Sequence, residues 1–120
     1  MRYRRGTAIV DTPRGILVAA GKHKIFLLPG GVAKKSESRK RAAIRELREE
    51  TRLKAYSYKY LFSYHSRYAR HKIFLIKAKG YARPSHEIRY IDYWKPGKNI
   101  ILSHTTKIII NKYLSLKKEK

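Results

Sequence analysis

The sequence predicts an α/β fold in which short strands form a mixed β-sheet flanked by two helices. Two features support this prediction. Apolar segments of strand length, separated by turns with Pro or Gly, occupy residues 7–29 and recur between residues 54 and 94. Apolar residues recur instead at helical spacing over residues 39–52 and again after Ser103. We therefore expect one central helix, one C-terminal helix, and strands before and between them.

The N-terminal third contains three predicted strands. TAIVD (7–11) and GILVAA (15–20) flank the stretch DTPRG, which places Pro at the first corner of a turn. A second turn leads to IFLLP (25–29), the third predicted strand, which runs into Gly30 and Gly31. Two consecutive glycines permit positive φ angles and let the backbone approach a ligand closely. This turn is therefore a candidate ligand-binding element.

The helix predicted over residues 39–52 begins after two serines. Either Ser36 or Ser38 can cap its start, because a serine oxygen can accept a bond from a free backbone N–H of the first turn. At about 100° per residue, one side of this helix is apolar and should face the core. That side contains Ala43, Ile44, Leu47 and Thr51.

Strands are predicted again over residues 54–64, 71–82 and 87–94, before a final helix that opens near Ser103. The first of these strands alternates strictly, so its aromatic side chains should share one face. Packing of this face on the core is the expected outcome, and stacking of a nucleobase is the alternative. The stripe consists of Tyr56, Tyr58, Tyr60, Phe62 and Tyr64.

The chain is strongly basic. Its 120 residues include 30 Lys plus Arg and only 8 Asp plus Glu, for a net charge of +22. Such a charge attracts phosphate-bearing partners such as nucleotides, RNA or DNA, and the binding should weaken as salt is added. A generally basic proteome is the alternative explanation. The absence of Gln and Cys is also typical of thermophilic proteins, which avoid thermolabile side chains.

A single domain is expected over residues 1–120, because a hydrophobic content of 42% can form a core and no linker or repeat interrupts the chain. No apolar run approaches the roughly 20 residues that span a bilayer, and the start turns polar too early for a signal peptide. Without cysteine, disulfides and thiolate metal sites are excluded. These features favour a cytoplasmic location.

Half of the acidic residues lie between positions 37 and 50. On the predicted helix, Glu46, Glu49 and Glu50 occupy one sector beside the apolar side. Glu46 and Glu50 are like charges at i, i+4, a pairing that costs roughly 0.2–0.5 kcal/mol in an isolated helix. A solvated helix face laced with ion pairs is the simpler explanation, but a cation between the carboxylates would resolve the repulsion. Carboxylates with a backbone carbonyl at the glycine turn would suit Mg²⁺ or Mn²⁺.

The stretch from Gly31 to Leu53 resembles the Nudix box, G-x5-E-x7-R-E-U-x-E-E-x-G-U, where U is a bulky aliphatic residue. Gly31, Glu37 and the run Arg45-Glu46-Leu47-Arg48-Glu49-Glu50 match with unbroken spacing. The one departure is Arg52, where the family usually has glycine. A glycine there would end the helix in the left-handed region. An arginine in that conformation costs about 1 kcal/mol or more, unless the helix exit is shaped differently.

The resemblance implies a Nudix α/β/α sandwich and a Mg²⁺- or Mn²⁺-dependent enzyme that hydrolyses a nucleoside diphosphate linked to another group. The metal ligands implied are Glu46, Glu49, Glu50 and the Gly30 carbonyl, and either Glu46 or Glu49 would be the base that deprotonates water. Arg45 would orient a catalytic glutamate, and Gly31 and Glu37 would support the motif, with Arg45 as the proposed ion-pair partner of Glu37. Glu87 is a candidate for a further acid from a distant loop, with a solvent-facing glutamate as the alternative.

Substrate-binding residues are less defined. Tyr68 and Arg70, in a predicted turn, are weak candidates for contacting a nucleotide, and the five histidines show no metal-ligand spacing. The resemblance leaves nucleoside triphosphates, ADP-ribose, dinucleoside polyphosphates and 5′-triphosphorylated RNA as substrates. Homodimer formation is compatible with it, since many relatives are homodimers. The alternative is a non-catalytic nucleic-acid-binding module on a Nudix scaffold, which would use the basic surface.

Overall fold

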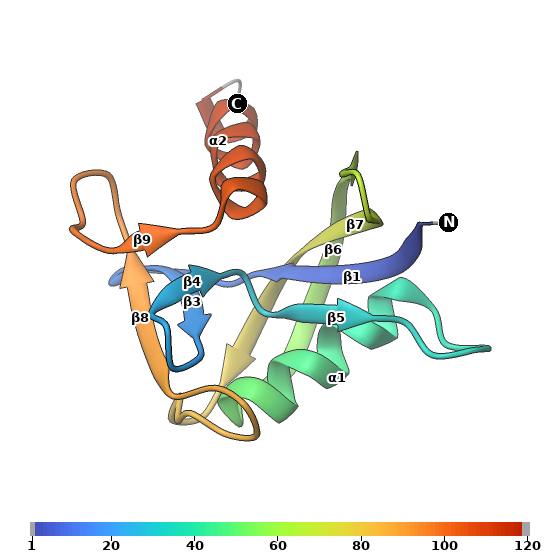
Figure 1. Cartoon of the computed structure of the whole chain (residues 1–120), viewed down its shortest axis with the longest axis horizontal. Coiled ribbons are helices and arrows are strands. Elements are labelled where there is room, and N and C mark those ends of the chain that lie inside the picture. Colours follow the sequence, from blue (N-terminus) through green and yellow to red (C-terminus); the bar gives the residue numbers. More distant parts are fainter. Residues whose placement is uncertain (1, 119–120) are drawn as a thin grey trace.

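The computed structural model describes residues 2–118, which form two curled β-sheets and two helices (Figure 1). The elements follow one another as β1 (Tyr3–Ile9), β2 (Asp11–Thr12), β3 (Gly15–Ala20), β4 (Ile25–Leu27), β5 (Gly30–Val32), α1 (Arg39–Thr51), β6 (Lys54–His65), β7 (Ala69–Lys79), β8 (Tyr90–Trp94), β9 (Ile101–Leu102) and α2 (His104–Lys118).

One sheet has four strands in the order β5-β1-β7-β6, with β1 and β7 parallel and the other pairs antiparallel. Helix α1 covers one face of this sheet. Gly6 in β1 makes the close approach possible, because a Cβ at this position would lie 1.9 Å from the backbone oxygen of Arg39. The apolar side of α1 predicted from the sequence packs here, with Ala43 and Leu47 fully buried against Ala8 and Phe74.

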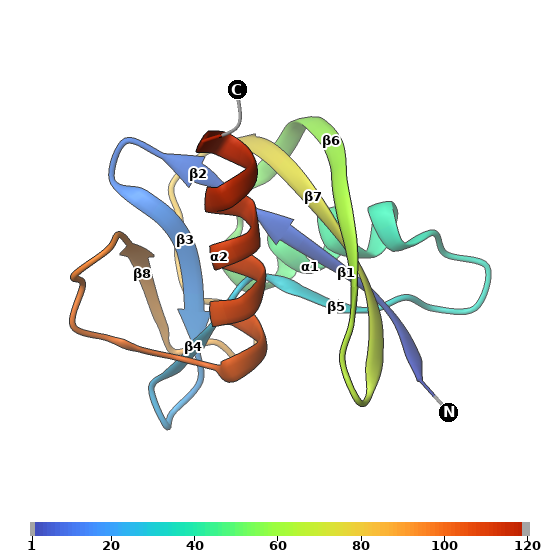
Figure 2. The same ribbon diagram turned by 90° about the horizontal axis from the view of Figure 1, so that it is seen from above.

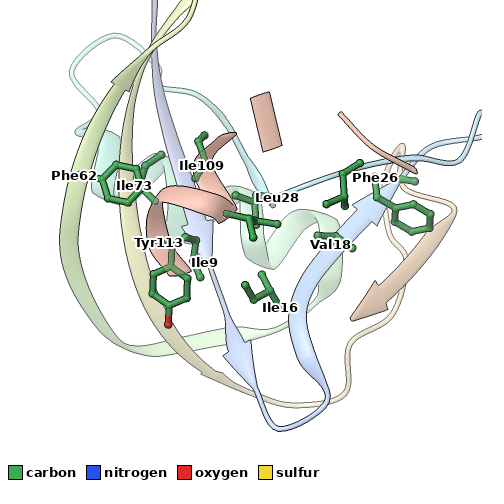
Figure 3. Packing of buried hydrophobic residues seen from close by; sticks show 12 residues of the cluster. Ile9, Ile16, Val18, Phe26, Leu28, Phe62, Ile73, Ile109 and Tyr113 are labelled. Carbon is green, nitrogen blue, oxygen red and sulfur yellow. The ribbon is translucent and has the colours of Figure 1, made fainter. Parts of the chain in front are cut away.

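The second sheet has five strands, in the order β2-β3-β4-β9, with β8 paired to β3. Helix α2 lies between this sheet and the four-stranded sheet (Figure 2). The main core fills the space between them, with Ile9 and Ile73 from one sheet, Val18 from the other, and Ile109 and Tyr113 from α2 (Figure 3). Tyr113 also donates a 2.6 Å hydrogen bond to Asp11 at the edge of the core.

The predicted α/β class and both helices are confirmed. The strands are divided between two sheets, and their ends differ from the sequence prediction: β1 starts at Tyr3, β4 stops at Leu27 and β8 starts only at Tyr90. The short strands β5 and β9 were not predicted, because two or three residues pair only when a neighbouring strand is brought beside them. Within residues 2–118, no helix has the length and apolarity needed to cross a membrane.

The aromatic stripe of β6 is split between two faces, so the prediction of one shared face is wrong. Tyr58 and Tyr60 lie opposite Ile76 and Phe74, on the face that carries α1. A β-bulge between Tyr60 and Phe62 inserts one extra residue, and Phe62 therefore turns to the core beneath α2. Burial follows this division: Phe62 is buried, whereas Tyr58 and Tyr60 are exposed.

Candidate active site

Helix α1 presents the glutamates, and both of its ends are defined by capping. Ser38, one of the two predicted caps, accepts a 3.1 Å hydrogen bond from the N–H of Arg41. At the other end Arg52 adopts the left-handed conformation with φ 68°, and its N–H donates to the Arg48 carbonyl at 2.8 Å. The helix thus ends as a glycine would end it, although the residue is arginine.

Arg45 is the centre of the charge network on this helix. Its Nε donates to Glu37 Oε2 at 2.8 Å and its Nη2 to Glu37 Oε1 at 3.0 Å. The hydrogen bond from Arg45 lowers the pKa of Glu37 to about 2. The same guanidinium donates through Nη1 to Glu46 at 3.2 Å and to Glu49 at 3.3 Å. The pairing of Glu37 with Arg45 expected from the sequence is therefore present, and Arg45 holds two of the glutamates in place.

The three helix glutamates lie in different electrostatic environments. Burial, followed by the charge of Glu46, raises the pKa of Glu50 to about 8, although the N–H of Gly30 donates to its Oε1 at 3.4 Å. Burial also raises the pKa of Glu46, whereas a hydrogen bond to Glu46 lowers that of Glu49. Arg45 therefore offsets only part of the repulsion and burial in this cluster, because the pKa values of Glu46 and Glu50 remain raised.

Gly31 provides the space that Glu46 occupies. A Cβ at this position would lie 1.7 Å from Glu46 Oε2 and 2.4 Å from its Cδ. Any larger residue would therefore displace the carboxylate. Glycine in β5 therefore allows the Glu46 side chain to approach the backbone closely.

The glutamates of α1 share a cavity of about 170 Å³ with a distant part of the chain. Its lining comprises Glu46, Glu49, Glu50, His86, Glu87 and Ile88. The segment before His86 is held against the end of α1, because the N–H of Ser85 donates to the Glu50 carbonyl at 3.2 Å. Glu87, the candidate from a distant loop, is therefore brought to the cluster. His86 was not singled out from the sequence, and its only signal there is its position beside Glu87.

Arg5 is a second residue that the sequence did not single out. It lines a larger cavity of about 300 Å³, together with Thr7, His71 and Thr106. Burial lowers the pKa of Arg5, while the charges of Glu50 and Glu46 raise it, so its guanidinium lies within reach of their field. No side chain among residues 2–118 forms an ion pair with it. Arg5 thus places a positive charge between the larger cavity and the glutamate cluster.

The remaining substrate candidates lie elsewhere. Tyr68, at the β6–β7 turn, is 67% exposed, and Arg70 follows at the start of β7. Neither residue lines the glutamate cavity or the larger cavity beside Arg5. His71, the residue after the exposed Arg70, is buried: its Nδ1 lies 3.1 Å from Thr7 Oγ1, and burial lowers its pKa to about 4.

The donor set of the glutamate cavity fits a hard divalent cation. Four carboxylates converge on one small cavity, and one of them is largely protonated because it is buried next to like charge. Among residues 2–118, no three His, Asp or Glu side chains already stand in a metal-binding arrangement, so binding would require the carboxylates to reorient. Oxygen donors alone, with no cysteine in the chain, suit Mg²⁺ or Mn²⁺.

Comparison with known proteins agrees with this geometry. The NUDIX domain family matches the chain over residues 2–101. A nudix hydrolase family member from Chromobacterium violaceum has 37% sequence identity, and the match covers 98% of this chain and 79% of that protein with a TM-score of 0.90. The chain belongs to the Nudix hydrolase family. Its members act on phosphoric anhydride bonds, and the family match over residues 2–101 includes the stretch from Gly31 to Leu53 that resembles the Nudix box.

Two further solved structures share the Nudix fold at lower identity. The MutT NUDIX hydrolase from Burkholderia pseudomallei has 19% identity, with 92% of this chain and 97% of that chain covered and a TM-score of 0.81. The second is a bifunctional NMN adenylyltransferase/ADP ribose pyrophosphatase from Francisella tularensis, complexed with AMP and Mn ion. It has 20% identity, the match covers 96% of this chain and 42% of that chain, and the TM-score is 0.71. A search of curated proteins gives no match.

Proposed function

We propose that this Nudix domain is a Mg²⁺- or Mn²⁺-dependent pyrophosphohydrolase that cleaves the diphosphate linkage of a nucleoside diphosphate derivative. The observation that carries the proposal is the convergence of Glu46, Glu49, Glu50 and Glu87 on one cavity beside a fixed Arg45. Such a cluster of like charges on a basic protein is explained by a cation and its phosphate-bearing substrate.

Glu46, Glu49 and Glu50 would hold the divalent ion, with the Gly30 carbonyl and Glu87 as further ligands. When bound, the ion would neutralise the charge that develops on the substrate phosphates. The Francisella tularensis structure, which shares this fold, contains AMP and Mn ion, and this favours a divalent ion as the cofactor. The chain's own contribution is a set of carboxylates carried on one rigid helix, and a reorientation of their side chains would complete the site.

The proton of the attacking water would pass to Glu46 or Glu49, and Arg45 would orient both through its Nη1. Arg5, which no carboxylate of residues 2–118 pairs with, would bind a substrate phosphate. The larger cavity beside Arg5 would then accept the nucleoside, because its lining combines apolar side chains with a few hydroxyl groups and a neutral His71.

The alternative is a non-catalytic nucleic-acid-binding module on the same scaffold. The net charge of +22 favours it, because polyanions would be attracted without any metal. The glutamate cavity argues against it, since a binder of polyanions gains nothing from a cluster of acidic groups that repel phosphate. The enzyme should release phosphate or nucleotide only with metal, whereas the binding module should show no turnover in the same assay.

The test is release of phosphate or nucleotide from a panel of substrates, with Mg²⁺, Mn²⁺ or EDTA. The panel contains nucleoside triphosphates, oxidised nucleoside triphosphates, ADP-ribose, diadenosine polyphosphates and 5′-triphosphorylated RNA. We expect turnover of one class only with metal, and losses in kcat of about 10²-fold or more in Glu46→Gln, Glu49→Gln and Glu50→Gln. Between the first two, the smaller residual kcat identifies the base.

Asp92→Asn is the matched control, because Asp92 pairs with Lys98 in another part of the molecule and does not line the cavity. It should retain activity within about twofold, as expected for a surface substitution. No turnover of any substrate at moderate and elevated temperature, combined with metal-independent RNA binding, would reject the enzyme and favour the binding module.

A further inference from the structure

The part of β6 beside α1 exposes two tyrosines. Tyr58 and Tyr60 are 48% and 49% exposed, which is high for large aromatic rings in a folded domain. Tyr58 and Tyr60 lie on the face of the sheet that carries α1, but on its edge strand, where the helix does not cover them. Only Tyr60 contacts a core ring, edge to face with Phe74 at 5.8 Å between centroids.

Cationic side chains surround these rings. Lys40 of α1 places Nζ 4.8 Å from the centroid of Tyr58, and Lys72 of β7 places Nζ 5.7 Å from that of Tyr60. Arg39 lies at the same end, with Nη1 donating to the Arg70 carbonyl at 3.3 Å. The stretch of residues 51–86, which includes both strands of the hairpin, contains nine Lys and Arg and no acidic residue. Positive charge here therefore has no local counter-charge.

Pairing with another β-strand does not explain this surface. Strand β6 is the end strand of its sheet, but two bulges interrupt its ladder, near Tyr56 and between Tyr60 and Phe62. Lys54 and Lys59 are exposed along it. Bulges and lysines on an edge strand prevent the addition of a further strand. The exposed rings and charges are thus better suited to a ligand that stacks and carries negative charge.

We propose that this surface, formed by Tyr58, Tyr60, Arg39, Lys40, Arg70 and Lys72, binds single-stranded RNA. Successive bases would stack on the tyrosine rings, while the basic side chains would contact the phosphates. The exposed pair of hydroxyls formed by Tyr60 Oη and Ser63 Oγ, 2.8 Å apart, can exchange hydrogen bonds with a ribose 2′-hydroxyl, which favours RNA over DNA.

This surface is separate from the proposed active site. None of its residues lines the glutamate cavity or the cavity beside Arg5. The inference therefore goes beyond the proposed function and stands if hydrolysis fails. It gives the exposed tyrosines a role that neither the core nor the glutamate cavity supplies.

The test is fluorescence anisotropy with a single-stranded RNA of about 20 nucleotides bearing a 5′-hydroxyl, in EDTA and at about 0.3 M salt, where phosphate contacts alone are weak. The full chain carrying Tyr58→Leu and Tyr60→Leu keeps its charge but loses both rings and their hydroxyls, and the corresponding Phe pair loses only the hydroxyls, so the difference between the two pairs reports on stacking. We expect Kd to rise about tenfold or more, given the size of base–aromatic stacking effects. The variant with Phe at both positions should bind within about threefold of wild type, because both rings remain.

The matched control is Tyr81→Leu with Tyr90→Leu, since these residues are 89% and 39% exposed and Tyr90 also lies under a lysine, Lys24, at 4.8 Å. The control should change Kd less than about twofold. The surface would be rejected if the test pair and the control pair lost RNA affinity equally. It would also be rejected if the variant with Tyr58→Leu and Tyr60→Leu kept its affinity. Tighter binding of DNA of the same sequence, or equal tyrosine-dependent binding of heparin or anionic vesicles, would reject RNA as the partner.

Discussion

Glu50 is the residue at which stability and proposed function oppose each other most directly. In the metal-free protein its pKa is raised to about 8 from an ordinary value of 4.5, by burial and by Glu46. Between these two pH values the unfolded chain loses the proton while the folded chain keeps it. The folded state is therefore penalised increasingly as pH rises from 4.5 to 8, and the penalty is complete above that range.

Glu50→Gln should consequently stabilise the metal-free protein while removing its activity. We expect the free energy of unfolding in EDTA to increase by an amount on the order of 1–3 kcal/mol near pH 8, and not to change near pH 4. Urea unfolding of the variant and of wild type at a series of pH values measures this difference in the free energy of unfolding. A stability gain that is independent of pH, or a loss at pH 8, would contradict the buried charge at Glu50.

Glu37→Gln is the control, because it should change the free energy of unfolding in the opposite direction to Glu50→Gln. The pKa of Glu37 is lowered to about 2 by its hydrogen bonds with Arg45, so its stabilising effect is present above its ordinary pKa of 4.5 and disappears as pH falls through 2. This variant should therefore be less stable than wild type near pH 7. It should also reduce activity, because Arg45 would lose the partner that positions it against Glu46 and Glu49.

At the scale of elements, the end of α1 shows how a helix tolerates an unfavourable residue. Arg52 holds the left-handed conformation at φ 68° because its N–H still closes the last turn on Arg48. The tertiary contacts after the helix maintain this exit, since the N–H of Arg83 donates to the Thr51 carbonyl at 2.9 Å. The strain of a residue with a Cβ is thus offset by contacts from a distant segment.

Arg52→Gly should relieve this strain. We expect a gain in the free energy of unfolding of about 0.5–1 kcal/mol, because glycine adopts the left-handed region without steric cost. Arg48→Gly, one turn earlier and also exposed, should instead lose about 1 kcal/mol, since glycine disfavours a helix interior. Thermal and urea unfolding of both variants measure the difference. Destabilisation by Arg52→Gly would show that the arginine side chain itself stabilises the helix exit.

At the scale of the whole molecule, the net charge of +22 sets the electrostatics. Five ion pairs occur among residues 2–118, and three of them share Arg45, so most cations have no partner. The domain measures 37 × 35 × 29 Å. At an ionic strength of about 0.01 M the Debye length is about 30 Å, so charges repel one another across the entire molecule.

Added salt should therefore stabilise the protein. We expect the free energy of unfolding to rise by about 1 kcal/mol or more between about 0.01 and 0.5 M NaCl, because compact states suffer most from self-repulsion. Urea titrations at each salt concentration measure it. Sodium sulfate at matched ionic strength is the control, and a much larger effect of sulfate would point to a specific anion site. A flat or falling dependence on NaCl would contradict the repulsion.

The helix and its proposed chemistry could be predicted from the sequence because both depend on local spacing. A repeat of about 100° per residue places Glu46, Glu49 and Glu50 together whatever surrounds them. The ion pair of Glu37 with Arg45, now seen at 2.8 Å, was implied instead by the resemblance to the Nudix box. The serine cap and the buried apolar side followed from the same short-range rules.

Other features required the tertiary structure, because they depend on which distant segments meet. Glu87 and His86 join the cluster only through backbone hydrogen bonds that tie the preceding segment to the end of α1. Arg5 reaches the same region because β1 pairs with β5 and β7 at the centre of its sheet. A bulge, whose position is set by packing and not by alternation, turned Phe62 of β6 into the core and left Tyr58 and Tyr60 exposed to solvent. Local periodicity thus determined the glutamate face, and long-range pairing decided what lies around it.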